Sequence, residues 1–121
     1  MKIKQLKAEY TYEYYLDIVN IKAKKDYTYR ESIDFDVGVF LDFDVNDFPV
    51  NLEILDASKR MNVDKKFLIN PNGNVNININ SELIELKVIF ENDGQKHTLS
   101  YLNKHDANLK ITDSETRLAL V

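Results

Sequence analysis

The sequence predicts a mainly β (α+β) fold, in which antiparallel β-hairpins and a C-terminal meander form a sandwich or a partly closed barrel. Three observations predict it. Apolar and polar residues alternate with period two along most of the chain. Turn-forming pairs such as Asp93-Gly94 separate the alternating segments. Residues 56–68 form the one stretch with a helical pattern.

The chain length of 121 residues predicts a single domain, 1–121, that is large enough for a hydrophobic core. The composition changes near Asn70, so a division into two sub-modules, 1–69 and 70–121, is the alternative. We favour one domain, because neither half has enough apolar faces to cover both sides of a sheet.

The N-terminal part is predicted to be extended. One face of its first segment carries Tyr10, Tyr12, Tyr14, Leu16 and Ile18. The other face is polar at first and then includes Tyr15, Val19 and Ile21, which predicts a strand that is partly covered on both sides. Residues 27–33 predict a second, weaker strand.

Residues 37–55 predict a hairpin with a two-residue turn at Asn46-Asp47. The predicted facing pairs are Val39 with Ile54, Leu41 with Leu52, and Phe43 with Val50, which makes one face wholly apolar. The other face collects Asp42, Asp44, Asn51 and Glu53. A slip of one residue would exchange the faces, so the pattern specifies the register.

The helical segment, residues 56–68, contains three polar residues suited to helix starts. Asp56 is predicted to cap a first turn and Asn62 a second, with Asp64 near the positive end of that second turn. A turn is expected at residues 70–73, because this segment contains Pro71 and Gly73.

The second half predicts a meander of three strands. Around Asp93-Gly94, the predicted pairs are Val88 with Leu99, Leu86 with Tyr101, Phe90 with His97, and Glu91 with Lys96. Around Asn80-Ser81, the predicted pairs are Ile77 with Ile84 and Val75 with Leu86. Residues 109–121 are expected to add one or two short strands around the Thr112–Glu115 segment.

The composition favours some classes of function and disfavours others. The formal net charge is −4, which disfavours binding to nucleic acid, and no apolar run is long enough to span a membrane. The absence of cysteine excludes disulfides and thiolate metal sites. We therefore expect a cytoplasmic protein.

Residues 40–47 and 52–59, with the sequences Phe-Leu-Asp-Phe-Asp-Val-Asn-Asp and Leu-Glu-Ile-Leu-Asp-Ala-Ser-Lys, carry a family resemblance. This part of the chain resembles the small prokaryotic family known as domain of unknown function 2283, over roughly the first half of the sequence. The turn differs, because Asn46-Asp47 stands where members have Asp-Gly or Asn-Gly. The resemblance implies a β-rich fold with a short helix and no established activity. Some members look like partners of small toxin-type proteins.

The acidic hairpin partly matches a calcium-binding loop. Asp42, Asp44, Asn46 and Glu53 occupy the first, third, fifth and twelfth positions of that pattern. The match fails at Asp47, where the loop requires glycine. The simpler interpretation is a solvated acidic face, and calcium is the one cofactor that the sequence suggests.

Three other residue types are candidates for function. Tyr10, Tyr12 and Tyr14 form a row that suits either a protein interface or packing within a sheet. The two histidines, His97 and His105, have no partners at metal-ligand spacing, although Asp106 follows His105, so packed or rim positions are expected. The alternating asparagines of residues 74–80 predict a solvated face that could pair with another strand if it lay at an edge.

These observations predict a non-enzymatic interaction domain that self-associates or binds a small protein partner. An antitoxin-like role is one version of this hypothesis. The alternative is binding of a divalent cation, calcium, on the acidic hairpin. No catalytic constellation stands out in the sequence, although an enzyme site could be built from scattered residues.

Overall fold

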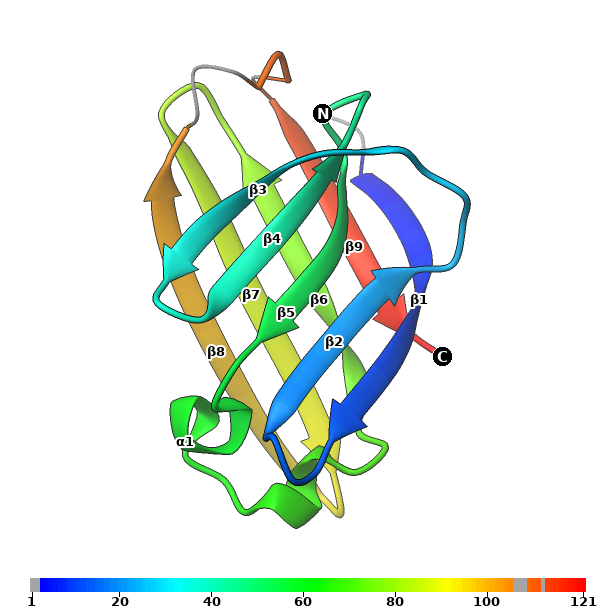
Figure 1. Cartoon of the computed structure of the whole chain (residues 1–121), viewed down its shortest axis with the longest axis vertical. Helices are drawn as coiled ribbons and strands as arrows, with labels where there is room; N and C mark the ends of the chain where they lie inside the picture. The colour runs from blue at the N-terminus through cyan, green and yellow to red at the C-terminus, as the bar shows by residue number, and fades with distance from the viewer. Residues whose placement is uncertain (1–2, 106–108, 112) are drawn as a thin grey trace.

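The computed structural model describes residues 3–105, 109–111 and 113–121. In these ranges the strands are β1 (Ile3–Glu13), β2 (Ile18–Ala23), β3 (Tyr29–Asp36), β4 (Val39–Asp44), β5 (Pro49–Ile54), β6 (Asn72–Ile79), β7 (Leu83–Asn92), β8 (Gln95–Lys104) and β9 (Ser114–Leu120). An α-helix, α1 (Ala57–Met61), and a 3₁₀ turn, η1 (Lys65–Leu68), lie between β5 and β6 (Figure 1). The predicted mainly β fold is confirmed.

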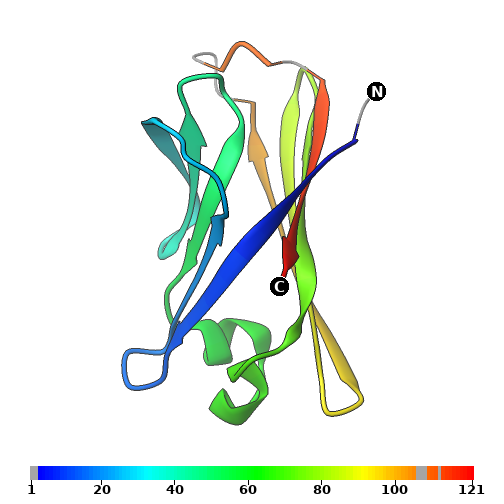
Figure 2. The same cartoon turned by 90° about the vertical axis from the view of Figure 1, so that its right-hand side faces the viewer.

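The nine strands form one sheet in the order β3-β4-β5-β2-β1-β9-β6-β7-β8. The sheet curls strongly into a half-barrel, in which β3, β4, β5 and β2 face β9, β6, β7 and β8, and β1 crosses between these two layers (Figure 2). Every pairing is antiparallel except that of β1 with β9, which is parallel. The sheet is thus mainly antiparallel, with one parallel junction between its first and last strands.

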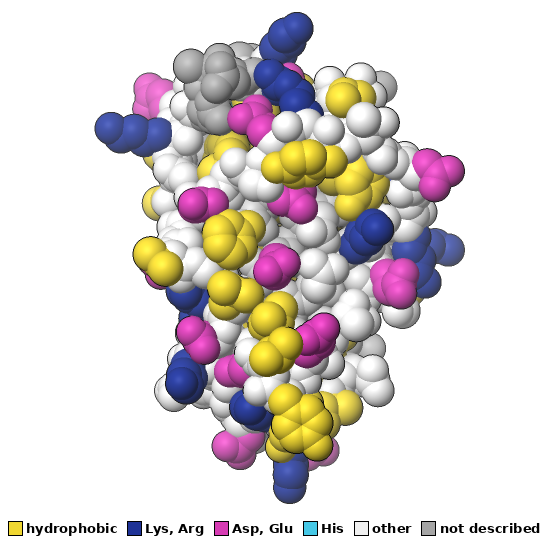
Figure 3. Space-filling view, viewed as in Figure 1, with side chains coloured by type: hydrophobic (Ala, Val, Ile, Leu, Met, Phe, Trp, Pro, Cys, Tyr) yellow, Lys and Arg dark blue, Asp and Glu magenta, His cyan; other side chains and the backbone are white. Residues whose placement is uncertain are grey.

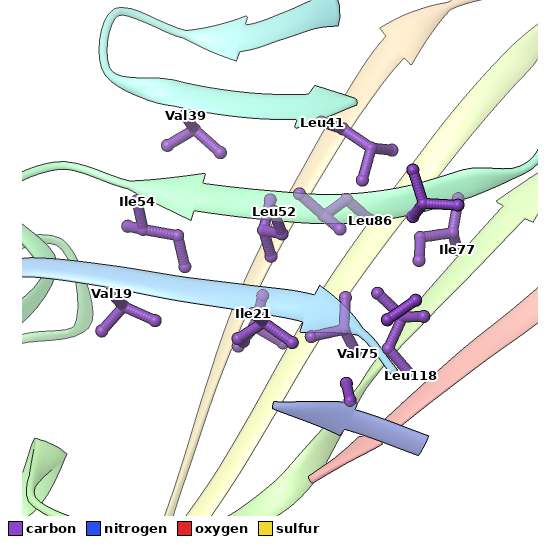
Figure 4. Close-up of a cluster of buried hydrophobic side chains, with 14 of the residues drawn as sticks. Val19, Ile21, Val39, Leu41, Leu52, Ile54, Val75, Ile77, Leu86 and Leu118 are labelled. Atoms are coloured by element: carbon purple, nitrogen blue, oxygen red, sulfur yellow. The ribbon is translucent and has the colours of Figure 1, made fainter. Parts of the chain in front are cut away.

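The core fills the space between the two layers. Side chains from β2, β4 and β5 point toward side chains from β6, β7 and β9 (Figure 4). The labelled residues of this cluster are Val19, Ile21, Val39, Leu41, Leu52, Ile54, Val75, Ile77, Leu86 and Leu118, and each is buried. Burying a side chain of this kind contributes about 1.5–3 kcal/mol. Residues 1–69 and 70–121 thus each supply strands to one shared core.

The first strand is shorter than predicted, because the chain reverses at residues 14–17. β1 pairs with β2, so that Tyr10 lies opposite Ile21 and Tyr12 opposite Val19. The predicted single strand through Ile18 was wrong. The four-residue turn accounts for the apolar residues that appeared on both faces: Tyr10 and Tyr12 face inward before the turn, and Val19 and Ile21 face inward after it.

The β4–β5 hairpin keeps two of its three predicted pairs. Val39 lies opposite Ile54 and Leu41 opposite Leu52, but a β-bulge places Phe43 opposite Pro49 instead of Val50. The connection spans residues 45–48, and the predicted two-residue turn was wrong. Two backbone N–H groups in this connection, those of Asn46 and Phe48, donate to one carboxylate oxygen of Asp44, which stabilises the longer turn.

The β7–β8 hairpin has all four predicted pairs. The β6–β7 hairpin is shifted by two residues, so that Val75 faces Val88 and Ile77 faces Leu86. Here the side chain of Asn80 accepts hydrogen bonds from the backbone of Glu82 and Leu83 and lengthens the turn. A shift of two residues preserves the inward face, so the predicted apolar face is correct although the register is not.

The asparagine-rich strand β6 lies between β9 and β7, in the interior of the sheet. Its backbone is therefore paired on both sides, and strand addition at β6 does not apply. The outward Asn76 side chain accepts a hydrogen bond from Arg117 of the neighbouring β9, at 3.0 Å.

The predicted helical segment is confirmed, but its predicted caps were wrong. Asp56 and Asn62 both adopt left-handed backbone conformations, and neither Asp56 nor Asp64 caps a helix with its side chain. Asn62 ends α1 instead of starting a second helix. The first turn of α1 is capped from the β1–β2 turn, where the backbone carbonyl of Asp17 accepts from Ala57 and its carboxylate accepts from Ser58.

Side chains hold the two edge strands, β3 and β8, close to each other. Asn103 of β8 donates to the carbonyl of Asp34 on β3 at 2.6 Å. Arg60 of α1 donates to the Asp36 carboxylate at 3.0 Å, to the Leu55 carbonyl at 2.7 Å and to the Val37 carbonyl. Arg60 also donates to the Tyr101 hydroxyl of β8 at 3.4 Å, so side chains bridge the open side of the half-barrel.

Replacing Arg60 by alanine is expected to lower the free energy of unfolding by about 2–3 kcal/mol, because it removes several charged hydrogen bonds from one mostly buried side chain. Urea denaturation measures this loss. The matched control is Lys59→Ala, which truncates the exposed neighbour on the same helix and should change stability little. Equal effects for the two variants would contradict a bridging role for Arg60.

Candidate functional site

The acidic hairpin is used by the fold itself. Asp42, on the outer face of β4, accepts hydrogen bonds from Ser32 at 2.5 Å and from Asn51 at 2.9 Å. Asp44 is buried, and its second carboxylate oxygen lies 3.8 Å from the Lys25 ammonium. The register shift between β4 and β5 skips Val50 of β5, and beyond it Asp44 is buried whereas Asp42 is only half-buried.

The other two predicted cation ligands, Asn46 and Glu53, occupy different environments. Asn46 is exposed in the β4–β5 turn, whereas Glu53 is half-buried on β5 between Phe40 and Asn20. Within residues 3–105, 109–111 and 113–121, no group of three or more acidic or histidine side chains could hold a metal ion. The geometry gives the calcium hypothesis no support, and it remains a prediction.

Asp47 is a buried acidic residue that the sequence analysis did not single out. It has a left-handed backbone conformation, and its carboxylate accepts from Arg30 and from the backbone N–H of Lys110, the latter at 2.9 Å. It therefore fastens the β4–β5 turn to β3 and to the segment before β9. The one local signal was its position in a predicted turn.

Two of the three predicted interface tyrosines face inward. The Tyr10 hydroxyl donates to the carbonyl of Leu68 at 2.6 Å, and its ring lies edge-on to Phe90 at 5.5 Å. Tyr12 donates to the carboxylate of Asp17 at 2.7 Å. Burial raises the pKa of both tyrosine hydroxyls, and Asp17 contributes to the rise of the Tyr12 pKa. The hydroxyl groups of both tyrosines therefore form hydrogen bonds inside the protein.

Asp17 is the centre of a buried hydrogen-bond network. Its carboxylate, in a residue that is only 6% exposed, accepts from the Tyr12 hydroxyl, from the Ser58 backbone at 3.0 Å and from the Ser58 hydroxyl at 2.7 Å. Burial alone would raise the pKa of Asp17, but hydrogen bonds from Ser58 and Tyr12 outweigh it and lower that pKa. The network joins the β1–β2 turn to α1.

The third predicted tyrosine, Tyr14, lies at the surface with two neighbours. Tyr14, Tyr15 and Leu16 are 43%, 94% and 63% exposed, and we call these three residues the tip surface. Lys65 lies over the Tyr14 ring at 5.1 Å and donates to the Tyr14 carbonyl at 3.0 Å. The sequence pattern assigned Tyr15 and Leu16 to the two faces of a strand and not to an exposed surface, although three consecutive apolar residues in a turn are an unusual pattern for solvent exposure.

The layer next to the tip surface also exposes apolar side chains. Ile18 of β2, Phe40 of β4 and Leu55 are half-buried, and they alternate with inward-facing core residues. Figure 3 shows hydrophobic side chains in a broken line down this layer to the end that carries the β1–β2 turn, with acidic side chains beside them. The layer that ends at the β1–β2 turn thus exposes a mixture of apolar and acidic side chains.

The molecule has a hollow at each end. At the α1 end, a cleft of about 750 Å³ lies between the helical segment and the β7–β8 turn, and its lining includes Lys59, Lys66, Asn92 and His97. His97 packs edge-on to Phe67 at 4.8 Å, as expected for a rim histidine. At the opposite end, a hollow of about 480 Å³ includes Lys4, Phe48, Ser114 and Thr116 in its lining.

His105 also occupies a structural position. One ring nitrogen lies 2.8 Å from the carbonyl of Ile111, which joins the end of β8 to the segment before β9. Asp106, the acidic neighbour noted in the sequence, and Thr112, in the predicted tail turn, lie outside the described residues. Ser100, the serine nearest to His97 in the sequence, is on the other side of β8 from it.

These features define a mainly β protein with a nine-stranded, strongly curled sheet and one short helix. Comparisons of the chain with protein-family models, with curated proteins and with solved structures find no match. The resemblance to domain of unknown function 2283 therefore stays an expectation. Among the described residues, no helix is long and apolar enough to cross a membrane.

Proposed function

We propose that this protein is a non-enzymatic interaction module that self-associates through the tip surface, Tyr14, Tyr15 and Leu16. The observation that carries this proposal is the exposure of Tyr15. This residue is 94% exposed to solvent, although its side chain is large and partly apolar. Tyrosine is enriched among the residues that dominate protein interfaces.

The second support is that the turn is held in place before any partner binds. Asp17, the last residue of the turn, bonds to Ser58 and Tyr12, and Lys65 bonds to the backbone of Tyr14. A contact residue on a fixed backbone loses less conformational entropy on binding than one on a mobile loop. Tyrosine adds to this advantage, because it buries a large area with few rotatable bonds.

The third support is the composition of the surroundings. The half-buried apolar residues Ile18, Phe40 and Leu55 lie in the layer that ends at the β1–β2 turn, with Glu53 beside Phe40 in the paired strand. An apolar centre with a polar rim is the usual arrangement of a protein interface. A small protein partner with a complementary surface would use the same residues.

Sedimentation velocity over a range of protein concentrations tests the proposal. The wild-type protein is expected to show a concentration-dependent dimer or higher oligomer. Tyr15→Ser is expected to weaken association by about 2 kcal/mol, which is roughly thirtyfold in Kd, while leaving the unfolding transition unchanged because the side chain contacts little of the fold.

Val37→Ser is the matched control, because Val37 is 89% exposed in a different turn, between β3 and β4. This variant should associate like the wild type. A protein that remains monomeric at every concentration would contradict self-association. An oligomer that Tyr15→Ser leaves intact would show that another surface is responsible.

A further inference from the structure

The hollow at the end of the molecule opposite α1 combines hydrogen-bond donors with apolar walls. Its lining comes from the start of β1, the β4–β5 turn and the start of β9. Its volume of about 480 Å³ lies within the range of small-molecule sites in proteins. It is at the other end from the tip surface, so it is independent of the proposed interaction.

Lys4 is an inward-facing lysine in this hollow. It belongs to the inner row of β1 that continues with Leu6 and Ala8, and β1 places it opposite Thr116 of β9. Its ammonium lies 3.8 Å from the centre of the Phe48 ring, with Lys25 next to it. Burial, together with the charge of Lys25, lowers the pKa of Lys4, as expected for a cation with incomplete compensation.

The charge of Asp44 acts on both lysines. Asp44 lies 3.8 Å from the Lys25 ammonium, and its other oxygen accepts two backbone hydrogen bonds from the β4–β5 turn. Two ammonium groups therefore share one buried carboxylate. Asp44 therefore compensates the Lys4 ammonium only in part.

The floor of the hollow adds two hydroxyl groups. The hydroxyl oxygens of Ser114 and Thr116 are buried, and neither has a hydrogen-bond partner among the described residues. Thr116 as a whole is only 1% exposed. A buried hydroxyl without a partner is energetically unfavourable, so an acceptor that reaches this floor would relieve that cost.

We propose that this hollow binds a small apolar molecule that carries one carboxylate. The carboxylate accepts from the Lys4 ammonium and from the hydroxyls of Ser114 and Thr116, which are donors of the kind that an anion requires. The apolar body lies against Ile3, Phe48 and Ile111, which also line the hollow. Asp113 and Glu115 at the β9 side disfavour a ligand with two negative charges.

Calorimetric titration with octanoate tests this assignment, with octanol and octylammonium as probes that share the apolar chain. Octanoate is expected to bind at one site, and octanol and octylammonium should bind at least about tenfold more weakly, because each lacks the charged acceptor. Equal binding of the three probes would overturn the proposal, and so would a lack of octanoate binding.

Two variants locate the site. Lys4→Gln should weaken octanoate binding by about tenfold or more, whereas Lys7→Gln, which removes an exposed charge from the same strand, should have no effect. Thr116→Val keeps the shape of the floor and should also weaken binding. If Lys4→Gln fails to fold, Thr116→Val and the comparison of the three probes on the wild-type protein still test whether the hollow binds a carboxylate. Octanoate binding that neither variant weakens would place the ligand elsewhere.

Discussion

Gly73→Ala is expected to reduce the free energy of unfolding by about 4 kcal/mol or more, which is a large part of the stability of a typical domain. Gly73 lies in β6 with φ at +150°, opposite Phe90 of β7. A Cβ at this position would lie 2.0 Å from the carbonyl oxygen of Ile89. Because the obstacle is backbone, no side-chain rotation can relieve it, and β6 and β7 would have to separate.

Circular dichroism and urea denaturation measure this effect. The control is Gly94→Ala, the same substitution in the β7–β8 turn. Gly94 has φ at +74°, and no atom of the described residues lies within 4 Å of an added Cβ. We expect Gly94→Ala to cost only the backbone strain, about 1–2 kcal/mol. Equal losses for the two variants would show that the strands adjust to the added methyl group at Gly73.

Asp17→Ala is the second large effect that we expect, at about 3–4 kcal/mol. The substitution removes the acceptor for the Tyr12 hydroxyl, the Ser58 hydroxyl and the Ser58 backbone, all in a buried position. It also places alanine at φ of 57°, which aspartate and asparagine tolerate better. A loss below about 1 kcal/mol would mean that water replaces the carboxylate.

The pH dependence of this contribution has a definite sign. Hydrogen bonds lower the pKa of Asp17 in the folded protein, so its contribution is present above the unfolded pKa of about 3.9 and is lost as pH falls through the folded pKa. Asp17→Asn keeps the side-chain shape and does not titrate. The stability difference between wild type and Asp17→Asn should therefore be constant near neutral pH and shrink below roughly pH 4.

Urea denaturation at a series of pH values gives this difference directly. Other carboxylates titrate in both proteins, so their contributions cancel in the comparison. A difference that stays constant through the acid range would contradict the lowered pKa of Asp17. A difference that grows as pH falls would reverse the assigned sign.

The sequence predicted strand pairing well where the turn is short and contains glycine. Asp93-Gly94 gave all four pairs of the β7–β8 hairpin. The register failed at turns where an aspartate or asparagine side chain accepts backbone hydrogen bonds, as Asp44 and Asn80 do. Such side chains stabilise longer turns, and periodicity alone does not indicate their length.

Features that depend on distant parts of the chain were not predictable from local patterns. Asp17 reaches Ser58 and Tyr10 reaches Leu68 only after the sheet has curled, so the sequence suggested neither the real helix cap nor the inward direction of the tyrosine row. The exposed tip surface had a local signal in its three consecutive apolar residues. The hollow around Lys4 had none, because its lining comes from three separate segments.

The parallel pairing of β1 with β9 has a consequence for the order of folding. Ile3 pairs with Glu115, so the first strand of the sheet meets the last one near the middle of the strand order. The sheet cannot be completed until β9 has been synthesised about a hundred residues after β1, and closing so long a loop slows the final step. Until then β1 and β6 each present an unpaired edge. During synthesis, this interval is when the chain is most exposed to aggregation.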